Sequence, residues 1–296
     1  MAYELVLGDR AYSSWSLRAW LLFERYGIPA DVRFVRLGNG RVAEQLAAHP
    51  PARSVPTLVA DDGAVICDSL AIAEELATRH PDAGIWPDSP RARAMSRSLA
   101  AEMHSGFAAL REGCPMNLRC AYRDYAPPED VLNDLARIES IWAHALDASG
   151  GPWLCGGYSV ADAFFAPVAA RIAGYGLSVG PGSRAYVEAH LADPAFRRWR
   201  AMGLVDGPDL PRFARDLARC PWPGPMPLPA VQAESGRSEN ANCPYSGRPV
   251  THFLELNGRI FGFCNPFCRD KTVADPEAWP AFMDLFQASR APSTSA

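Results

Sequence analysis

The spacing of apolar residues changes once along this 296-residue chain, and that change limits the folds open to it. Up to about residue 82, short strand-like runs alternate with helical patterns in the order β-α-β-α-β-β-α. From Pro90 to about residue 250 apolar residues recur only at helical spacing. The sequence therefore predicts a small α/β unit over 1–82 and an all-helical unit over 88–218.

The individual elements follow from local patterns and turn residues. In the first unit we expect strands at 4–8 and 31–37, helices at 15–26, 41–48 and 68–79, and a hairpin at 55–66 around Asp61-Asp62-Gly63. In the second unit we expect helices at 91–111, 129–148, 163–172, 183–191 and 194–203, the third of them preceded by the capping box Ser159 to Asp162.

The composition of the chain changes again after Arg219. Residues 220–229 contain five prolines, and residues 232–242 are polar and rich in small residues. Such a segment is typical of a linker, stiff first and flexible later, which we place at 219–242. A last module is expected at 243–288, followed by a disordered tail at 289–296.

Bulk properties exclude several classes of protein. The net charge of −4 gives no sign of a nucleic-acid or anionic membrane surface, so neither partner is expected. No apolar run approaches the roughly 20 residues that span a bilayer. The first eight residues lack the basic and apolar segments of a signal peptide, so we expect a cytoplasmic protein whose eight cysteines form no disulfide framework.

Two serines stand at the start of the first expected helix. A helix N-terminus carries unpaired N–H groups and a partial positive charge, which favour an anion. A hydroxyl of Ser13 or Ser14 could therefore donate a hydrogen bond to a bound thiolate and lower the pKa of that thiol. The simpler alternative is that these serines only cap the helix, as serines commonly do.

Two further pairs of residues fit a peptide-binding site. Pro56 lies within an apparent strand, where proline is disfavoured, and a cis bond after Val55 would turn the Val55 backbone outward to pair with a peptide. A trans proline at a strand start is the alternative. Asp68 and Ser69 open the next helix and could hold an amino-acid head group, or could act as an ordinary cap.

Together these motifs resemble the glutathione transferase family over roughly residues 1–205. The segments YSSWSLRAWLLFERYGIP, RSVPTLVADDGAVICDSLAIAEELATRHP and SVADAFFAP stand in family order and spacing. The double serine is similar to serine-type classes, including the zeta class of maleylacetoacetate isomerases. AEMHSGFAALREGCPMNLR is similar to a bacterial subgroup of such transferases.

The resemblance implies a thioredoxin-like domain that binds glutathione, a helical domain that binds a small hydrophobic electrophile, and a homodimer. It implies Ser14, with Ser13 as rival, as the hydroxyl beside the glutathione thiolate. Its implied glutathione-binding residues are Arg53, Val55, a cis Pro56, Asp68 and Ser69. Zeta-like motifs have a cysteine where this chain has Trp15, which argues against isomerase activity.

Three of the cysteines, Cys243, Cys264 and Cys268, gather near the end of the chain. A strand, a turn at Asn257-Gly258 and a second strand would bring them together. Thiolates select zinc or another thiophilic metal, and a metal commonly stabilises so small a core. Three unbound thiols are the alternative. His252 or a water could be the fourth ligand.

The cysteine segment, with GRIFGFCNPFCRDKTVADPEAW at its centre, resembles the treble-clef-like YHS/TRASH modules. Three functions therefore stay open. The leading one is a glutathione transferase. The second is a metal-sensing or metal-handling protein on a transferase scaffold, and the third is a glutathione-dependent isomerase.

Overall fold

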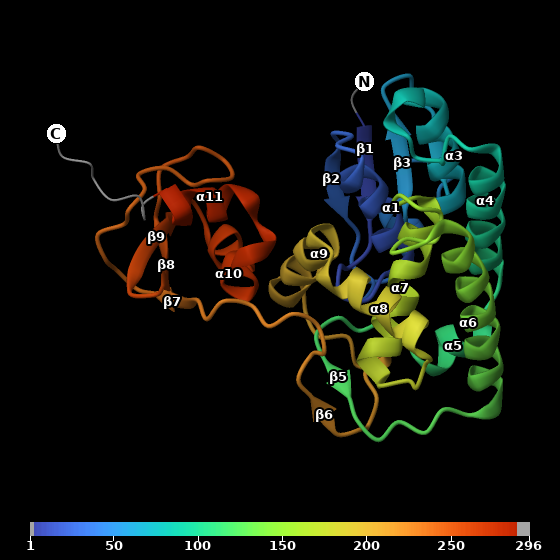
Figure 1. Cartoon of the computed structure of the whole chain (residues 1–296). Helices are drawn as coiled ribbons and strands as arrows, with labels where there is room; N and C mark the ends of the chain where they lie inside the picture. The colour runs from blue at the N-terminus through green and yellow to red at the C-terminus, as the bar shows by residue number, and fades with distance from the viewer. Residues whose placement is uncertain (1–2, 289–296) are drawn as a thin grey trace. The chain divides into compact units, whose positions relative to one another are not determined.

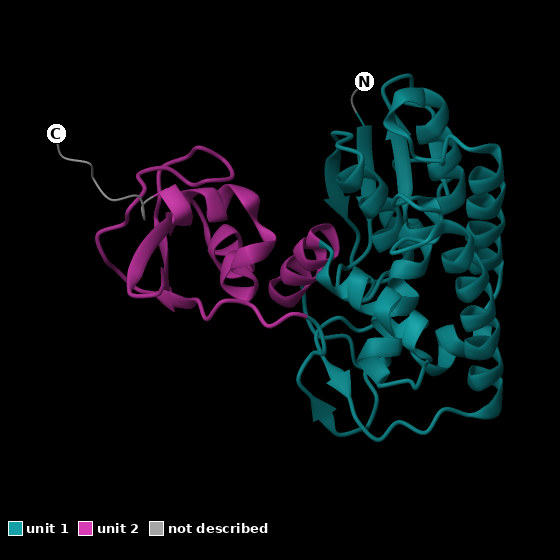
Figure 2. Ribbon diagram, in the orientation of Figure 1, with its two compact units in different colours: residues 1–193, 207–224 teal, residues 194–206, 225–296 magenta. Residues whose placement is uncertain are grey.

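A computed structural model describes residues 3–288 of the chain. The chain forms two compact units (Figure 2). The first comprises Met1–Asp193 and Gly207–Gly224, and the second comprises Pro194–Asp206 and Pro225–Ala296. The backbone thus leaves the first unit, contributes one helix to the second, and returns before it leaves finally after Gly224.

The first unit begins with a four-stranded sheet of order β2-β1-β3-β4 (Figure 1). β1 pairs in parallel with β2 and antiparallel with β3, and β4 completes a hairpin with β3. The strands are β1 (Tyr3–Leu7), β2 (Asp31–Phe34), β3 (Thr57–Ala60) and β4 (Val65–Cys67). Helices α1 (Ser14–Arg25), α2 (Val42–Gln45) and α3 (Ser69–Arg79) complete a thioredoxin-like domain in the predicted order.

The rest of the first unit is mainly helical, as predicted. Its helices are α4 (Pro90–Ser105), α5 (Ala108–Gly113), α6 (Glu129–Ser149), α7 (Val160–Tyr175) and α8 (Pro181–Ala192), and 3-10 turns lie at Pro81–Ala83 and Pro211–Phe213. α7 is buried almost all round and packs against α1, α4 and α8. Its N-terminus has the predicted capping box, in which the Ser159 amide donates to Asp162 Oδ2 at 2.8 Å.

One long helix was expected over residues 91–111, and that prediction is wrong. The helix ends at Ser105, Gly106 is extended with ψ −172°, and Phe107 has a left-handed φ of 59° before α5 begins. A Cβ at position 106 would lie 2.8 Å from the carbonyl oxygen of Glu102, so this turn requires glycine. Apolar spacing alone does not reveal the break, because Phe107 and Leu110 still continue the same stripe.

The second unit is a small sheet with short helices. Its sheet has the order β7-β8-β9. The elements are α9 (Pro194–Val205), β7 (Val231–Ala233), β8 (His252–Leu256), β9 (Arg259–Phe263), α10 (Pro266–Ala274), a 3-10 turn at Pro276–Ala278, and α11 (Pro280–Ala288). The predicted turn is present: Asn257 and Gly258 have φ values of 54° and 73°, which two-residue hairpins require.

The segment 219–242, expected to be only a linker, also carries short strands. β7 pairs antiparallel with β8 at the edge of the second unit's sheet. β6 (Arg219–Cys220) pairs with β5 (Ala121–Tyr122) in the first unit. The expectation of no strand between residues 90 and 250 is therefore wrong, because two- and three-residue edge strands leave no readable alternation. The expected tail at 289–296 lies outside the described residues.

No helix in the described part of the chain, residues 3–288, combines the length and apolar character that a membrane span requires.

Candidate functional site

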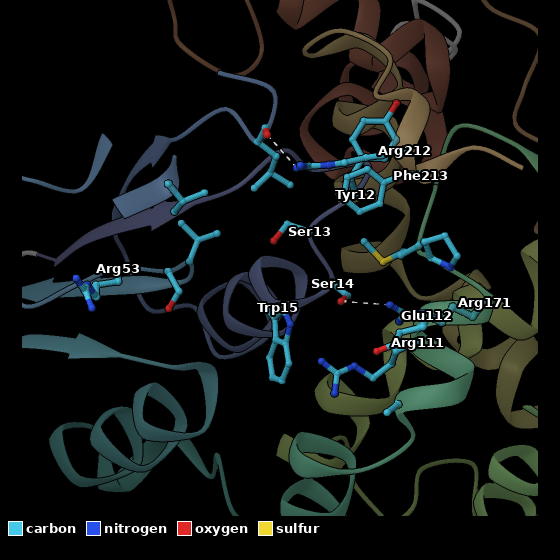
Figure 3. Close-up of a pocket in the computed structure, with 17 residues that line it drawn as sticks. Tyr12, Ser13, Ser14, Trp15, Arg53, Arg111, Glu112, Arg171, Arg212 and Phe213 are labelled. Carbon is cyan, nitrogen blue, oxygen red and sulfur yellow. Dashed lines mark hydrogen bonds between the residues drawn. The ribbon is translucent and has the colours of Figure 1, made fainter. Parts of the chain in front are cut away.

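A cavity of about 560 Å³ opens in the first unit beside the N-terminus of α1 (Figure 3). The thioredoxin-like domain contributes one wall, and α5, α7 and the segment after Gly207 contribute the other. Its lining residues are Tyr12, Ser13, Ser14, Trp15, Leu37, Val42, Arg53, Ser54, Val55, Ala108, Arg111, Glu112, Pro115, Met116, Arg171, Arg212 and Phe213. Of the residues expected in the glutathione site, Ser13, Ser14, Arg53 and Val55 line this cavity.

The two candidate serines have different hydrogen-bond partners. Ser13 is the N-cap of α1: its Oγ accepts from the amide of Ser16 at 3.3 Å, and its hydroxyl donates to Ser16 Oγ at 2.8 Å. Ser14 is the first residue of α1, and its Oγ accepts from Arg171 Nη2 at 3.4 Å (Figure 3). The Ser14 hydroxyl proton is thus available to a ligand, whereas that of Ser13 is already used.

Tyr12 also lines the cavity, but its hydroxyl is engaged elsewhere. It donates to Asp209 Oδ1 at 3.2 Å and accepts from the amide of Leu210 at 3.2 Å. Its ring stacks on Phe213, with ring centroids 5.0 Å apart. Burial raises the pKa of the Tyr12 hydroxyl. The geometry therefore favours a serine over this tyrosine as the donor to a bound thiolate.

The loop before β3 presents a free stretch of backbone. The peptide bond from Val55 to Pro56 is cis, as predicted. Within the described residues, neither the N–H nor the C=O of Val55 has a hydrogen-bond partner. An extended peptide lying along this loop could use both groups. Pro56 itself does not line the cavity.

Asp68 and Ser69 lie at the N-terminus of α3 and do not line the cavity. Asp68 caps the helix through Oδ1, which accepts from the amide of Leu70 at 2.8 Å, and its Oδ2 lies 3.3 Å from His104 Nε2. Ser69 is fully buried, and its hydroxyl has no partner within the part of the chain that the structure describes. A buried polar group is normally paired, so this hydroxyl is an exception, and the structure does not bring it to the cavity that Ser14 lines.

The arginines on the helical side of the cavity were not singled out by sequence reasoning. Arg171 of α7 is 5% exposed and donates to the carbonyls of Cys114 and Pro167 as well as to Ser14. Burial and the nearby charge of Arg111 lower the pKa of Arg171 to about 10. The sequence did contain a signal for Arg171: it is a charged residue in the otherwise apolar run of α7, and arginine is rarely buried without a role.

The three C-terminal cysteines do come together in the second unit. The Sγ atoms of Cys243, Cys264 and Cys268 all lie within 4.8 Å of one another, and those of Cys264 and Cys268 are 4.0 Å apart. Cys264 lies two residues before the start of α10, and Cys268 lies in its first turn, where Asn265 caps the helix by accepting from the Cys268 amide at 2.8 Å.

This donor set fits a thiophilic metal. Tetrahedral zinc with Zn–S bonds of about 2.3 Å separates its sulfur ligands by roughly 3.8 Å, close to the observed spacing. Although burial alone would raise it, the amides of Tyr245, Cys264 and Ser246 lower the pKa of the Cys243 thiol to about 7. His252 is not in the group; its Nδ1 is paired with Thr251 Oγ1 at 2.9 Å.

Comparison with known proteins agrees with the fold of the first unit. Residues 12–79 match the family described as glutathione S-transferase, N-terminal domain. A Burkholderia glutathione transferase homologue with bound glutathione has a TM-score of 0.53 and 25% identity, covering 69% of this chain and 98% of its own. A Methylococcus capsulatus glutathione transferase, at 22% identity and a TM-score of 0.52, shares the fold over 68% of this chain and 98% of its own.

Two curated relatives are similar in sequence. A probable maleylacetoacetate isomerase of Caenorhabditis elegans is 35% identical over 101 residues, which is 34% of this chain and 46% of that protein. The maleylacetoacetate isomerase of Pseudomonas aeruginosa is 28% identical over 183 residues, 58% of this chain and 82% of that protein. The chain thus spans about half the length of the first relative and most of the second.

Residues 12–79 thus match the N-terminal domain of glutathione S-transferases, and the sheet order and helical domain of the first unit give it the glutathione transferase fold.

Proposed function

We propose that the chain is a glutathione transferase that joins glutathione to a small electrophile. The observation that carries this proposal is the hydroxyl of Ser14, which begins α1, faces the cavity and keeps its proton free because Arg171 donates to its oxygen. Such a group stabilises a thiolate in the same way that oxyanion donors stabilise an alkoxide. The activated sulfur then forms a bond to the electrophilic carbon.

In this proposal the glutathione peptide lies along the loop before β3. The unpaired N–H and C=O of Val55, which precedes the cis Pro56, would pair with its cysteinyl backbone. The unpaired hydroxyl of Ser69 and the carboxylate of Asp68 would receive the γ-glutamyl end. Arg53 would receive the glycyl carboxylate, since a guanidinium suits a planar carboxylate.

A pair of serine variants tests the assignment of the hydroxyl. Ser14→Ala is expected to raise the pKa of enzyme-bound glutathione and to lower kcat by about 10²-fold, the effect of removing one such donor. Thiolate absorbance near 240 nm against pH and turnover with a chloronitrobenzene report the two effects.

Ser13→Ala is the matched control, because it removes the neighbouring hydroxyl, which already donates its proton to Ser16 Oγ. It should lower stability more than kcat. The reverse pattern, with the loss of kcat in Ser13→Ala alone, would assign the role to Ser13.

A glutathione-dependent isomerase is the second candidate, favoured by the names of the two curated relatives. It would use the same thiolate, which adds to a double bond and leaves again after rotation. Trp15 lines the cavity between Ser14 and Ser16, where zeta-like motifs have a cysteine. Assaying maleylacetone isomerisation beside conjugation distinguishes the two candidates.

For the second unit we propose that Cys243, Cys264 and Cys268 bind zinc or another thiophilic metal. The convergence of their sulfur atoms supports this proposal. Metal analysis of the purified full chain should give about one ion per protein, and Cys264→Ser with Cys268→Ser should abolish it. Cys67→Ser, which removes a thiol of the first unit, is the control. The homodimer and the cytoplasmic location expected from the sequence stay predictions.

A further inference from the structure

The cavity holds an excess of positive charge beside Ser14, on the side away from Arg53. Figure 3 shows Arg53 at one side and Arg111 and Arg171 at the other, with Ser14 and Trp15 between them. Four arginines and a single acidic residue, Glu112, line the cavity. Arg53 is proposed above to bind glutathione, so the other arginines are available to another ligand.

The arginines near Ser14 lack anionic partners. Arg171 donates only to two carbonyls and to Ser14, none of them charged. Arg111 donates to the carbonyl of Gly106 at 3.5 Å and lies over the Trp15 ring, 4.7 Å from its centroid. Within the described residues, no carboxylate forms an ion pair with either side chain.

A third guanidinium also contacts Trp15. Arg18 of α1 is 1% exposed, and its Cζ lies 4.3 Å from a ring centroid of that side chain. Its Nε and Nη1 have no hydrogen-bond partner in the described part of the chain. Burial and the charges of Arg171 and Arg111 lower the pKa of Arg18, and the charge of Asp68 opposes this shift.

Such an arrangement is unfavourable until an anion binds. Buried charges are normally paired, because desolvation is costly without an opposite charge. Arg111 and Arg171 line the same side of the cavity as Glu112 (Figure 3), and Trp15, Pro115 and Met116 add an apolar surface to the lining. A carboxylate between the two guanidiniums would receive charge-assisted hydrogen bonds, while an adjoining ring or chain would lie against the apolar wall.

We propose that Arg111 and Arg171 bind a carboxylate on the electrophilic co-substrate, so that the second substrate is an anionic electrophile. This inference rests on the proposed transferase function. It narrows the class of co-substrate: the sequence predicts a small hydrophobic electrophile, and the arginines favour one that also carries a carboxylate. Arg111 acts as a specificity residue. Arg171 would bind both the co-substrate and Ser14, so a substitution of Arg171 would change two interactions at once.

A matched pair of aryl chlorides tests the proposal: 4-chloro-3-nitrobenzoate and its methyl ester. In both, the glutathione sulfur forms a C–S bond at the ring carbon that carries chlorine, and chloride leaves with the electron pair of the broken C–Cl bond. Dividing kcat/KM by the uncatalysed rate constant with glutathione removes the difference in intrinsic reactivity. We expect this corrected ratio of acid to ester to exceed about 10, a typical value of a charge-assisted hydrogen bond.

Arg111→Gln should bring the corrected ratio close to 1, while Arg111→Lys, which keeps the charge, should retain most of the preference. Arg33→Gln removes an exposed arginine of β2 whose partner is Glu4, so it controls for the change in net charge. It should leave the ratio as in the wild type. A wild-type ratio at or below 1, or a preference that survives in Arg111→Gln, would overturn the proposal.

Binding of the products provides a second readout that does not depend on turnover. Calorimetry should give S-(4-carboxy-2-nitrophenyl)glutathione at least a tenfold lower Kd than its methyl ester, and Arg111→Gln should remove the difference. If glutathione and its conjugates bind but neither chloride is turned over, the transferase function fails and the binding ratio alone decides the anion site. Equal affinities of the two conjugates would refute that site.

Discussion

At the scale of single residues, position along a helix start decides what each serine can do. Ser13 precedes α1, so its oxygen turns back to the amide of Ser16, as an N-cap does. Ser14 begins the helix, so its side chain turns outward to Arg171 and the cavity. Two adjacent residues of the same type therefore differ in role because only one hydroxyl has an unused donor.

Asp162 gives a prediction about pH. Burial raises the pKa of this carboxyl from 3.8 to about 6, although hydrogen bonds from Leu154, Ser159 and Tyr186 oppose the shift. Between about pH 4 and pH 6 the unfolded state releases this proton and the native state retains it, so its contribution to stability falls as pH rises. The free energy of unfolding should lose about 3 kcal/mol through this group by pH 7.

Urea unfolding of the wild type and Asp162→Asn at pH 4, 5, 6 and 7 measures that loss. The difference in unfolding free energy, wild type minus variant, should be largest at pH 4 and should fall by about 2 kcal/mol towards pH 7. The same substitution at Asp147, exposed on α6, controls for the loss of one carboxylate. A difference that does not change with pH would contradict the predicted shift.

At the scale of elements, the break between α4 and α5 shapes the site. Gly106 and Phe107 leave helical geometry, and α5 then places Ala108, Arg111 and Glu112 on the cavity wall. An uninterrupted helix would carry these side chains in another direction. The turn therefore links a backbone feature to the chemistry proposed for Arg111.

Gly106→Ala tests this link. Its Cβ would lie 2.8 Å from the carbonyl oxygen of Glu102, which is also the acceptor of the Gly106 amide, so the turn must shift. We expect a loss of about 1–3 kcal/mol in stability and a larger change in kcat/KM for the anionic electrophile than for its ester. Thermal unfolding and the paired assay give both values.

Gly182→Ala in α8 is the control, since Gly182 is exposed and the added carbon would meet no atom within 4 Å beyond its chain neighbours and its own helix backbone. Helix propensity predicts a gain of roughly 0.5–1 kcal/mol there. Equal stability of the two alanine variants would show that the Gly106 turn tolerates a side chain.

At the scale of the whole molecule, the cysteine module includes more chain than its cysteines suggest. α9 packs against α10, and Arg197 of α9 makes two hydrogen bonds to Asp275, at 2.8 and 2.7 Å. Arg198 donates to the carbonyl of Ala278 at 3.0 Å. The domain limits of 88–218 for the helical part and 243–288 for the module stay predictions, while the compact unit joins 194–206 to the C-terminal segment.

Hydrogen exchange with and without a chelator tests this division. If a metal stabilises the second unit, its removal should lower the protection of α9 amides together with those of α10. The amides of α7, which lie in the first unit, should keep their protection. Retention of α9 protection when α10 loses its own would instead join α9 to the transferase unit.

The sequence by itself determined the features that depend on a few neighbouring residues. The approximate starts of α1, α3 and α7 follow from the caps Ser13, Asp68 and Ser159, and the hairpin at Asn257-Gly258 follows from the turn. The order of elements in the thioredoxin-like domain follows from periodicity, and three of the four cavity-lining residues of the candidate glutathione site follow from helix starts and the unusual proline. These features are readable because their causes lie within a few positions of one another.

Only the tertiary structure decided which charges meet. Arg18, Arg111 and Arg171 come from three helices up to 153 residues apart, and they gather because α1 and α7 pack together and α5 turns at Gly106. α9 belongs to the second unit because its partners, Asp275 and Ala278, lie about 80 residues later. Periodicity shows that a helix has a buried face but not which distant helix covers it, so the gathering of these arginines and the place of α9 in the second compact unit required the fold.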